Sequence, residues 1–193
     1  MRKLVYMINM SVDGCIAGPE GEVGFFSFAG DHLQALAAEF PETVSAPMRA
    51  MMGVEGVVNK RFDTVVMGSG SYRPALEHGM AVPFPQLKQY VVSQTLTEVD
   101  PAVSVVADPV GLLTLLKQQQ GRDIWLSGGG KLASSLVELV DDLILIIHPV
   151  VAGDGVRIFD GGLNPVLFAC TSSKVLGNGV TIARYERAEQ KDV

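Results

Sequence analysis

Short apolar runs and amphipathic segments alternate along the first three quarters of the chain. The apolar runs, at residues 3–10, 62–67, 89–93, 103–107 and 124–126, have the length and composition of buried strands. Segments with apolar residues at helical spacing lie between them. This alternation predicts an α/β fold, in which helices cover both faces of a sheet.

The helical segments carry end signals of their own. Asp31 is placed to cap a helix over residues 31–40, with Gln34 three positions on. Asp108 is placed to cap the next clear helix, Pro109 suits its first position, and Gly121 ends it. The apolar faces expected to pack on the sheet are Leu33, Leu36, Ala37 and Phe40; Tyr72, Ala75 and Leu76; Leu112, Leu113, Leu115 and Leu116; and Leu132, Leu136 and Val140.

Two regions depart from the alternation. Residues 41–60 are interrupted by prolines and glycines and are expected to form a mobile flap over a ligand rather than one helix. Strands at 143–151, 163–173 and 179–187 then follow one another without helices, joined by short turns such as 176–179. Consecutive strands of this kind pair antiparallel. The sheet is therefore expected to be parallel in its main part and antiparallel at its C-terminal strands.

Length and composition limit the classes of partner. A chain of 193 residues fits one domain, predicted over residues 1–193. The net charge of −6 and the lack of any Lys/Arg run exclude nucleic acid and membrane surfaces as expected partners and favour a small molecule. A signal peptide is not expected, because polar residues soon follow the positive start, and no apolar run reaches bilayer length, so a cytoplasmic location is expected. Cys15 and Cys170 fit buried thiols, and no metal site is predicted.

Two glycine-rich turns carry the strongest chemical signal. One apolar strand runs into Gly128, Gly129 and Gly130 and then into a helical segment, and another runs in the same way into residues 68–71. Such turns at helix N-termini bring bare backbone N–H groups against a phosphate. They also occur where a backbone only passes close to a neighbour. Two of them in one sheet favour the phosphate interpretation and predict a dinucleotide cofactor.

The same residues exclude two common nucleotide-binding folds. Leu132 follows Lys131 where a P-loop needs Ser or Thr to bind Mg²⁺. A Rossmann fold places its glycine fingerprint after the first strand, where this chain has a turn at residues 11–14.

A combined pattern covers nearly the whole chain in five segments, at residues 11–17, 66–72, 90–96, 124–132 and 149–155. In this order the segments resemble the dihydrofolate reductase-like fold, and within it the family containing the reductase domain of bacterial riboflavin biosynthesis. The resemblance implies an NADPH-dependent reductase, with NADH as the alternative cofactor, that transfers a hydride to a small heterocycle such as a pterin or pyrimidine. It also implies a homodimer and a cis peptide bond at Gly128–Gly129.

The resemblance also assigns residues to the cofactor and the substrate. Ile16 and Ala17 would line the nicotinamide and its ribose, while Ser93 and Gln94 would lie near the adenosine ribose and its 2′-phosphate. Asp31, the nearest match to the pocket carboxyl of the folate enzymes, is the candidate catalytic residue, with helix capping as the alternative. The pyrophosphate would lie between two groups of residues: Met67, Gly68, Ser69, Gly70 and Ser71, and Ser127, Gly128, Gly129, Gly130, Lys131 and Leu132.

Two positions depart from the family pattern, which commonly has arginine where this chain has Ser69 and Gln94. Arginine binds phosphate as a charged fork, so discrimination for the 2′-phosphate is expected to weaken by about tenfold or more. The cations expected to compensate are Lys60, Arg61, Arg73 and Lys131. The missing arginines also keep open a second hypothesis, a non-catalytic dinucleotide-binding protein on the same scaffold.

The remaining polar and aromatic residues have simpler expected roles. Asp13 is expected to form a turn and Trp125 to pack in the core. His148 lies within an apolar strand and faces either the substrate or a strand edge. His32 and His78 lie in polar surroundings and are expected on the surface.

Overall fold

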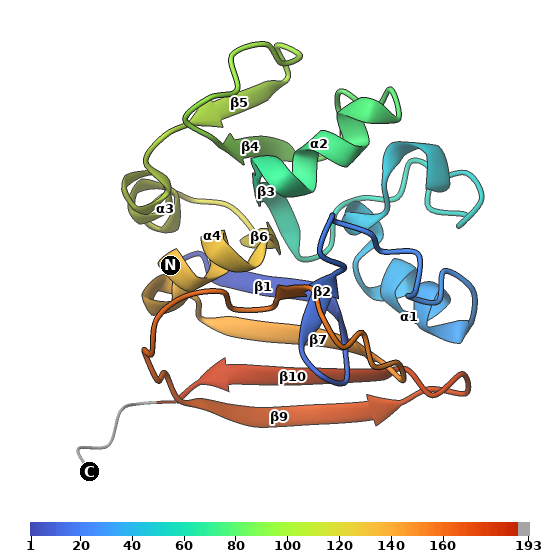
Figure 1. Cartoon of the computed structure of the whole chain (residues 1–193). Helices are drawn as coiled ribbons and strands as arrows, with labels where there is room; N and C mark the ends of the chain where they lie inside the picture. Colours follow the sequence, from blue (N-terminus) through green and yellow to red (C-terminus); the bar gives the residue numbers. More distant parts are fainter. Residues whose placement is uncertain (189–193) are drawn as a thin grey trace.

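One eight-stranded sheet forms the centre of the computed structural model, which describes residues 1–188; the predicted domain extends to residues outside this range, 189–193. The strand order is β5-β4-β3-β6-β1-β7-β10-β9, from top to bottom of Figure 1. The strands are β1 (Leu4–Ser11), β3 (Phe62–Gly68), β4 (Lys88–Val92), β5 (Val103–Val106), β6 (Asp123–Gly128), β7 (Asp142–His148), β9 (Phe168–Val175) and β10 (Thr181–Arg187).

The sheet is mixed, as the sequence predicts. All pairs from β5 to β7 are parallel. β10 then pairs antiparallel with both β7 and β9. The change of direction follows from the connections, because a short turn links β9 to β10, whereas longer connections, most of which contain a helix, join the parallel strands.

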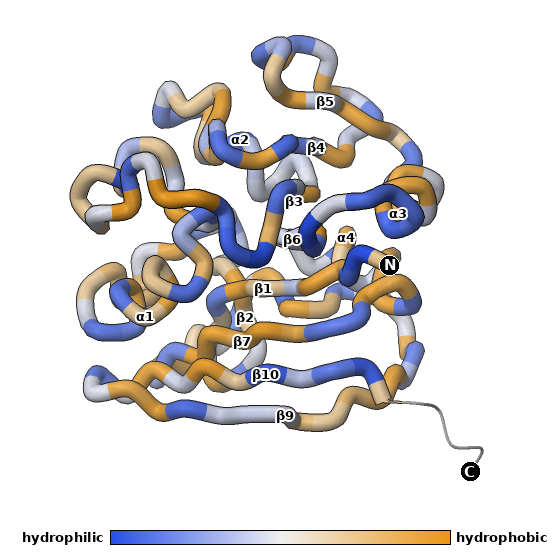
Figure 2. The backbone as a smooth tube through the Cα atoms, turned by 180° about the vertical axis from the view of Figure 1, so that it is seen from behind, coloured by the Kyte–Doolittle hydropathy of each residue, from blue (hydrophilic) through white to orange (hydrophobic). Residues whose placement is uncertain are grey.

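Helices cover both faces of the sheet, as predicted. Val5 and Met7 of β1 belong to one core cluster, which includes side chains from α1 (Asp31–Glu39) and α2 (Ser69–Glu77). Leu4 and Tyr6 belong to the other, with side chains from α3 (Pro109–Gln118) and α4 (Gly130–Ser135). Figure 2 shows hydrophobic residues along much of β1 and β7, the strands that lie between these helical layers.

The helix ends agree with the sequence in one case and differ in another. Asp108 caps α3, where its Oδ1 accepts the backbone N–H of Gly111 at 3.0 Å. Asp31 does not cap α1, because Gly30 occupies the cap position and Asp31 is the first helical residue. The expected apolar face of α3 is also wrong at Leu115, which is 63% exposed.

The segment after residue 130 is less helical than its spacing predicts. α4 ends at Ser135, and a 3₁₀ turn, η3 (Val137–Leu139), follows it. Leu136 and Val140 are nevertheless fully buried, so the apolar spacing identifies the packed face correctly.

Two short strands were not predicted. β2 (Cys15–Ala17) pairs antiparallel with β8 (Val156–Arg157), forming a small second sheet. Both strands are too short to give a periodic pattern, and they pair across most of the chain.

The antiparallel edge of the main sheet is open. β9 begins at Phe168, later than predicted, and is exposed along most of its length, with Val175 68% exposed. Cys170 lies on this strand and is exposed, which corrects the expectation of a buried thiol; Cys15 is buried. An uncovered edge strand can pair with a second copy of the chain, so the homodimer stays a prediction with this edge as its natural surface.

Residues 41–60 are anchored to the sheet at their base. They contain two 3₁₀ turns, η1 (Pro41–Thr43) and η2 (Ala46–Met48). The fully buried carboxylate of Glu42 accepts the backbone N–H groups of Lys60, Arg61 and Phe62 at 3.1, 2.7 and 2.7 Å. This carboxylate therefore fixes the start of β3. Within residues 1–188, no helix is both long and apolar enough to cross a membrane.

Candidate functional site

Near its carboxyl end, β1 is uncovered at residues 8–10, although it lies in the middle of the sheet and its last residue, Ser11, is buried. Leu4 and Val5 are fully buried, whereas Ile8 and Met10 are partly exposed and Asn9 is exposed. A central strand covered by helices on both faces is normally buried throughout. Residues 8–10 therefore form an open end of β1, the position where open α/β sheets bind ligands.

The two predicted glycine turns meet beside this open end. A Cβ atom on Gly68 would lie 3.5 Å from the backbone nitrogen of Gly129, in the other turn. A Cβ atom on Gly128 would lie 3.4 Å from both Ser71 Oγ and Ile8 Cδ1. Side chains at these glycines would fill the space between the turns. The peptide bond Gly128–Gly129 is cis, as the resemblance implies.

The helices that start at these turns have no side-chain caps within residues 1–188. Gly68 and Gly129 occupy the cap positions of α2 and α4, while α3, on another connection, is capped by Asp108. The first N–H groups of a helix need a partner, and an anion supplies one where no side chain does. The N-terminus of α2, with exposed Gly70 between Ser69 and Ser71, is therefore suited to a phosphate group.

Gly130 has a packing role instead. Any Cβ atom there would overlap the carbonyl oxygen of Arg157 on β8, and Gly130 O accepts the backbone N–H of Asp160 at 3.3 Å. Gly130 therefore fits the close-approach interpretation of glycine turns. Gly129 is partly exposed and Lys131 is exposed.

β2 carries the residues expected to meet the nicotinamide. Ile16 is nearly buried, Ala17 is partly exposed, and a Cβ atom on Gly155 would overlap the carbonyl oxygen of Ala17. The loop at residue 155 therefore packs directly on the backbone of β2. This packing holds β2 beside the end of β1.

Asp13 fastens the same region, in the turn role that the sequence predicts. Its carboxylate accepts Ser11 Oγ–H at 2.6 Å and the backbone N–H groups of Ala152 and Gly153 at 3.0 and 2.8 Å. These hydrogen bonds hold the pKa of Asp13 far below its usual value. Asp13 is thus a charged clamp between the turn after β1 and the loop after β7.

The end of β4 has the residues expected near the 2′-phosphate. Ser93 Oγ accepts the backbone N–H groups of Thr95 and Leu96 at 3.2 and 3.0 Å, so this hydroxyl shapes the turn. Gln94, which follows it, is exposed.

Of the four cations expected to compensate for the missing arginines, two lie away from the glycine turns. Arg61 pairs with Asp142 and Asp123 at the amino end of β3, and Lys60 donates to the carbonyl of Ala38. Gly68 is at the opposite end of that strand. Arg73 on α2 and Lys131 on α4 are exposed on the helices that begin at the glycine turns.

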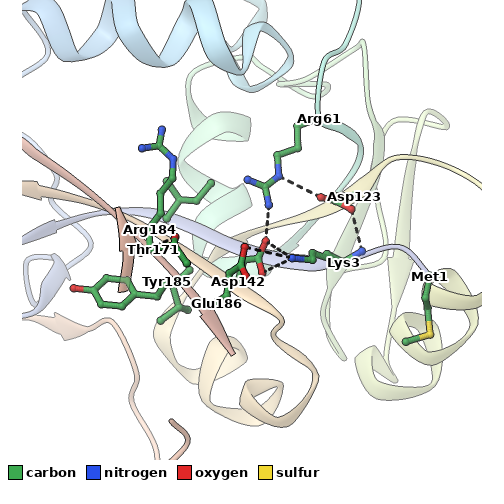
Figure 3. Close-up of a pocket in the computed structure, with 11 residues that line it drawn as sticks. Met1, Lys3, Arg61, Asp123, Asp142, Thr171, Arg184, Tyr185 and Glu186 are labelled. Atoms are coloured by element: carbon green, nitrogen blue, oxygen red, sulfur yellow. Dashed lines mark hydrogen bonds and ion pairs between the residues drawn. The ribbon is translucent and has the colours of Figure 1, made fainter. Parts of the chain in front are cut away.

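A cavity of about 360 Å³ lies at the amino ends of the strands. Figure 3 shows Lys3 and Arg61 directed at Asp142, with N···O distances of 3.0 and 2.6 Å, and Arg61 also bonded to Asp123 at 3.2 Å. The hydrogen bond that Lys3 Nζ donates to the Asp142 carboxylate raises the pKa of Lys3. Opposite charges pair within this cluster, which joins the starts of β1, β6 and β7. We interpret it as a structural ion network.

A buried histidine pair lies beside the open end of β1. His148, at the end of β7, is 2% exposed; its Nε2 is 3.0 Å from Asn9 Oδ1 and its Nδ1 is 3.3 Å from the backbone N of Ser27. The His32 ring packs edge-on against it, with centroids 5.4 Å apart. His32 is buried, so its predicted surface position is wrong, while His78 is exposed as expected.

His148 is expected to make the fold sensitive to mild acid. Burial, with His32 as a second cause, lowers its pKa from 6.5 to about 4, so the folded protein binds fewer protons here than the unfolded chain does. The contribution to stability is complete above pH 6.5 and falls by up to about 3 kcal/mol as the pH drops toward 4. Urea unfolding across this range measures it.

Two substitutions separate the protonation of His148 from that of carboxylates, which also bind protons as the pH falls toward 4. His148→Gln is expected to flatten the pH dependence of the unfolding free energy, whereas His78→Gln, at an exposed histidine, is expected to leave it unchanged. The same slope in His148→Gln and in the parent chain would contradict this assignment.

Asp31 lies near these histidines but its carboxylate is engaged. Asp31 Oδ2 accepts the backbone N–H of Gly177, in the β9–β10 turn, at 2.8 Å, and this bond lowers the pKa of Asp31. Its catalytic role stays a prediction.

Trp125 is buried and donates its Nε1–H to Met7 O at 3.0 Å, as expected for a core residue. Residues 1–188 contain no group of three or more His, Cys, Asp or Glu side chains arranged to hold a metal ion.

Comparisons with known proteins agree with this geometry. Residues 2–182 match the family model described as the RibD C-terminal domain. The chain is 26% identical to the uncharacterized protein YyaP of Bacillus subtilis, over 93% of this chain and 92% of the relative.

Among the solved structures that share the fold are two that match over nearly their whole length. One is a putative riboflavin biosynthesis protein from Shewanella sp. PV-4, with a TM-score of 0.69, 23% identity, and coverage of 97% of this chain and 99% of that one. The other is dihydrofolate reductase from Enterococcus faecalis complexed with NADP(H), with a TM-score of 0.66, 14% identity, and 97% of each chain covered.

Proposed function

This chain belongs to the RibD C-terminal domain family, and from that membership we propose that it is an NADPH-dependent reductase acting on a small heterocyclic substrate. One observation carries the proposal: two glycine turns, each starting a helix without a side-chain cap, meet at the open end of a central strand. A related fold in Enterococcus faecalis dihydrofolate reductase holds NADP(H). The residues here suit the same group.

The first turn of α2 would hold the pyrophosphate. The N–H groups of Ser69, Gly70 and Ser71 lack a side-chain partner from the N-cap residue, and the helix dipole favours an anion there. Gly129 and Lys131 would face the same group from the turn after β6. Gly68 and Gly129 are partly exposed and have no side chains, so a diphosphate has room to approach the backbone.

The nicotinamide end would lie toward β2 and the open end of β1. A bound reduced nicotinamide supplies the hydride, so the protein needs to orient two rings and exclude water. Ile16 and Ile8 provide apolar surface for this purpose, and the Asp13 clamp fixes the loops beside it. Ser93 and Gln94 would lie near the 2′-phosphate.

Paired measurements of NADPH binding and NADPH oxidation test the proposal. The reductase hypothesis predicts binding together with oxidation when pterins or pyrimidines are added. Binding without oxidation across such a panel would favour the second hypothesis, a non-catalytic dinucleotide-binding protein. Absence of binding would remove both.

Restoring an arginine is expected to sharpen cofactor choice. Gln94 is exposed, so Gln94→Arg should leave stability unchanged while adding a charged fork near the proposed 2′-phosphate site. The ratio of NADPH to NADH affinity is expected to rise by about tenfold, since a charge-assisted hydrogen bond is worth about 1.5–3 kcal/mol against roughly 1 for a neutral one. Fluorescence titration with both dinucleotides measures this ratio. Gln94→Met, which adds no charge, serves as the control, and a ratio unchanged in Gln94→Arg would place the 2′-phosphate elsewhere.

A further inference from the structure

Asn9 is the exposed polar residue at the open end of β1. Along β1 it follows Val5 and Met7 at every second position, so its side chain lies on the same face as theirs, the α1 side of the sheet. Asn9 Oδ1 lies 3.0 Å from His148 Nε2, on the neighbouring strand β7. An exposed amide on the central strand, fixed at one end by a buried ring, is placed to meet a ligand.

The hydrogen bonds fix which way this amide faces. The backbone N–H of Ser27 can only donate, so His148 Nδ1 accepts it and carries no proton. In the neutral ring the proton is then on Nε2, which donates to Asn9 Oδ1. The Asn9 oxygen is thereby turned toward His148, and its NH₂ group, with two donors, is turned away from it.

Surrounding contacts hold this orientation in place. Ser27 O accepts a hydrogen bond from His32 Nε2 at 3.1 Å, and Asn178 Nδ2 donates to His32 Nδ1 at 2.8 Å. The Phe26 ring packs on His148, with centroids 4.7 Å apart. The low pKa of His148 keeps the ring neutral at pH 7, so the donor and acceptor roles do not change there.

We propose that Asn9, oriented by His148, determines substrate specificity by donating its amide N–H to a carbonyl oxygen of the heterocycle. This inference rests on the proposed reductase function, because it assumes that a heterocycle binds at the open end of β1. Asp31 Oδ2 is directed to the β9–β10 turn, where it accepts the backbone N–H of Gly177 at 2.8 Å. The ligand-facing polar group on β1 is therefore the Asn9 amide, whose two donors favour a carbonyl group over an amino group.

A pair of probes of nearly equal shape tests the proposal. 2,4-Dioxopteridine presents carbonyl oxygens where 2,4-diaminopteridine presents amino groups. Wild-type protein is expected to bind the dioxo probe at least about tenfold more tightly, since mispairing two donors leaves both unsatisfied. Affinities are measured by fluorescence titration at pH 7.5, with and without NADP⁺.

Asn9→Asp is the decisive variant. A carboxylate still accepts the His148 Nε2–H, so the anchor is kept, but the atom that faces the ligand now accepts instead of donating. The preference is expected to reverse, with the diamino probe bound about tenfold more tightly. Asn164→Asp makes the same charge change in an exposed loop and is expected to keep the wild-type preference. Thermal unfolding verifies that each variant folds.

Three results would overturn the proposal: equal affinities of the wild-type protein for the two probes, a preference that Asn9→Asp leaves unchanged, or failure of both probes to bind. NADPH titration of the same samples judges the proposed function separately. A protein that binds NADPH but does not discriminate between the probes refutes only the role of Asn9. Failure to bind NADPH, with probe discrimination retained, refutes only the reductase proposal.

Discussion

A Gly70→Asp variant is expected to fold at least as stably as the parent chain and to bind NADPH roughly 30- to 100-fold more weakly. Gly70 is exposed in the first turn of α2, and a Cβ atom there meets no atom within 4 Å in the described part of the chain. Aspartate in a first helical turn is favourable, and it replaces a poor helix former. The same carboxylate would compete with the pyrophosphate for the N–H groups of α2 and repel it.

The neutral variant Gly70→Asn separates charge from size. It is expected to keep most of the NADPH affinity, because its amide has nearly the same shape as the carboxylate and carries no charge. Isothermal titration and thermal unfolding are measured on all three proteins. Unchanged affinity in Gly70→Asp would show that the pyrophosphate does not bind at the start of α2.

Glu42→Ala is expected to cost about 3–5 kcal/mol of unfolding free energy, a large share of the stability of a domain. The Glu42 carboxylate is fully buried and accepts the N–H groups of Lys60, Arg61 and Phe62. Alanine leaves these donors without their partner and opens space at the start of β3. Urea unfolding followed by tryptophan fluorescence measures the loss, since Trp125 lies in the same core cluster as Phe62.

Glu39→Ala is the matched control for this variant. Glu39 pairs with Arg184 at the surface, where its side chain is 48% exposed, and such pairs contribute at most about 1 kcal/mol. A loss below about 1 kcal/mol in Glu42→Ala, with an unchanged denaturant slope, would mean that residues 41–60 do not depend on this anchor.

The fold was predictable because its main elements are long and periodic. Apolar runs at residues 3–10 and 62–67 correspond to β1 and β3, and Asp108 caps α3 where its sequence places it. The glycine turns were also visible, since a strand that ends in glycines is a local signal. The features that depend on residues close together in the chain could therefore be predicted from the sequence.

The features that were missed depend on contacts between distant residues. β2 and β8 pair across more than a hundred residues and are too short to show a period. His32 lies among polar neighbours in sequence, yet it is buried in the fold, where it forms hydrogen bonds with Ser27 and Asn178. Only a sheet that places β7 beside β1 reveals that His148 orients Asn9.

The roles of the three glycines at the end of β6 also depend on contacts between distant residues. Gly128, Gly129 and Gly130 look equivalent in sequence, but Gly130 is required because Arg157 lies against it. Whether a glycine faces a ligand or a neighbouring backbone is decided by which segment returns to cover it. That segment, residues 156–160, carries no sequence signal for this contact.

Titration of the purified protein with NADPH and NADH, following nicotinamide fluorescence and the unfolding temperature in the same samples, tests the central claim most directly. Saturable binding of NADPH is expected to raise the unfolding temperature, to weaken roughly 30- to 100-fold in Gly70→Asp and to be largely kept in Gly70→Asn. Absence of saturable binding for both dinucleotides would contradict the claim, because the two glycine turns would then serve the fold alone.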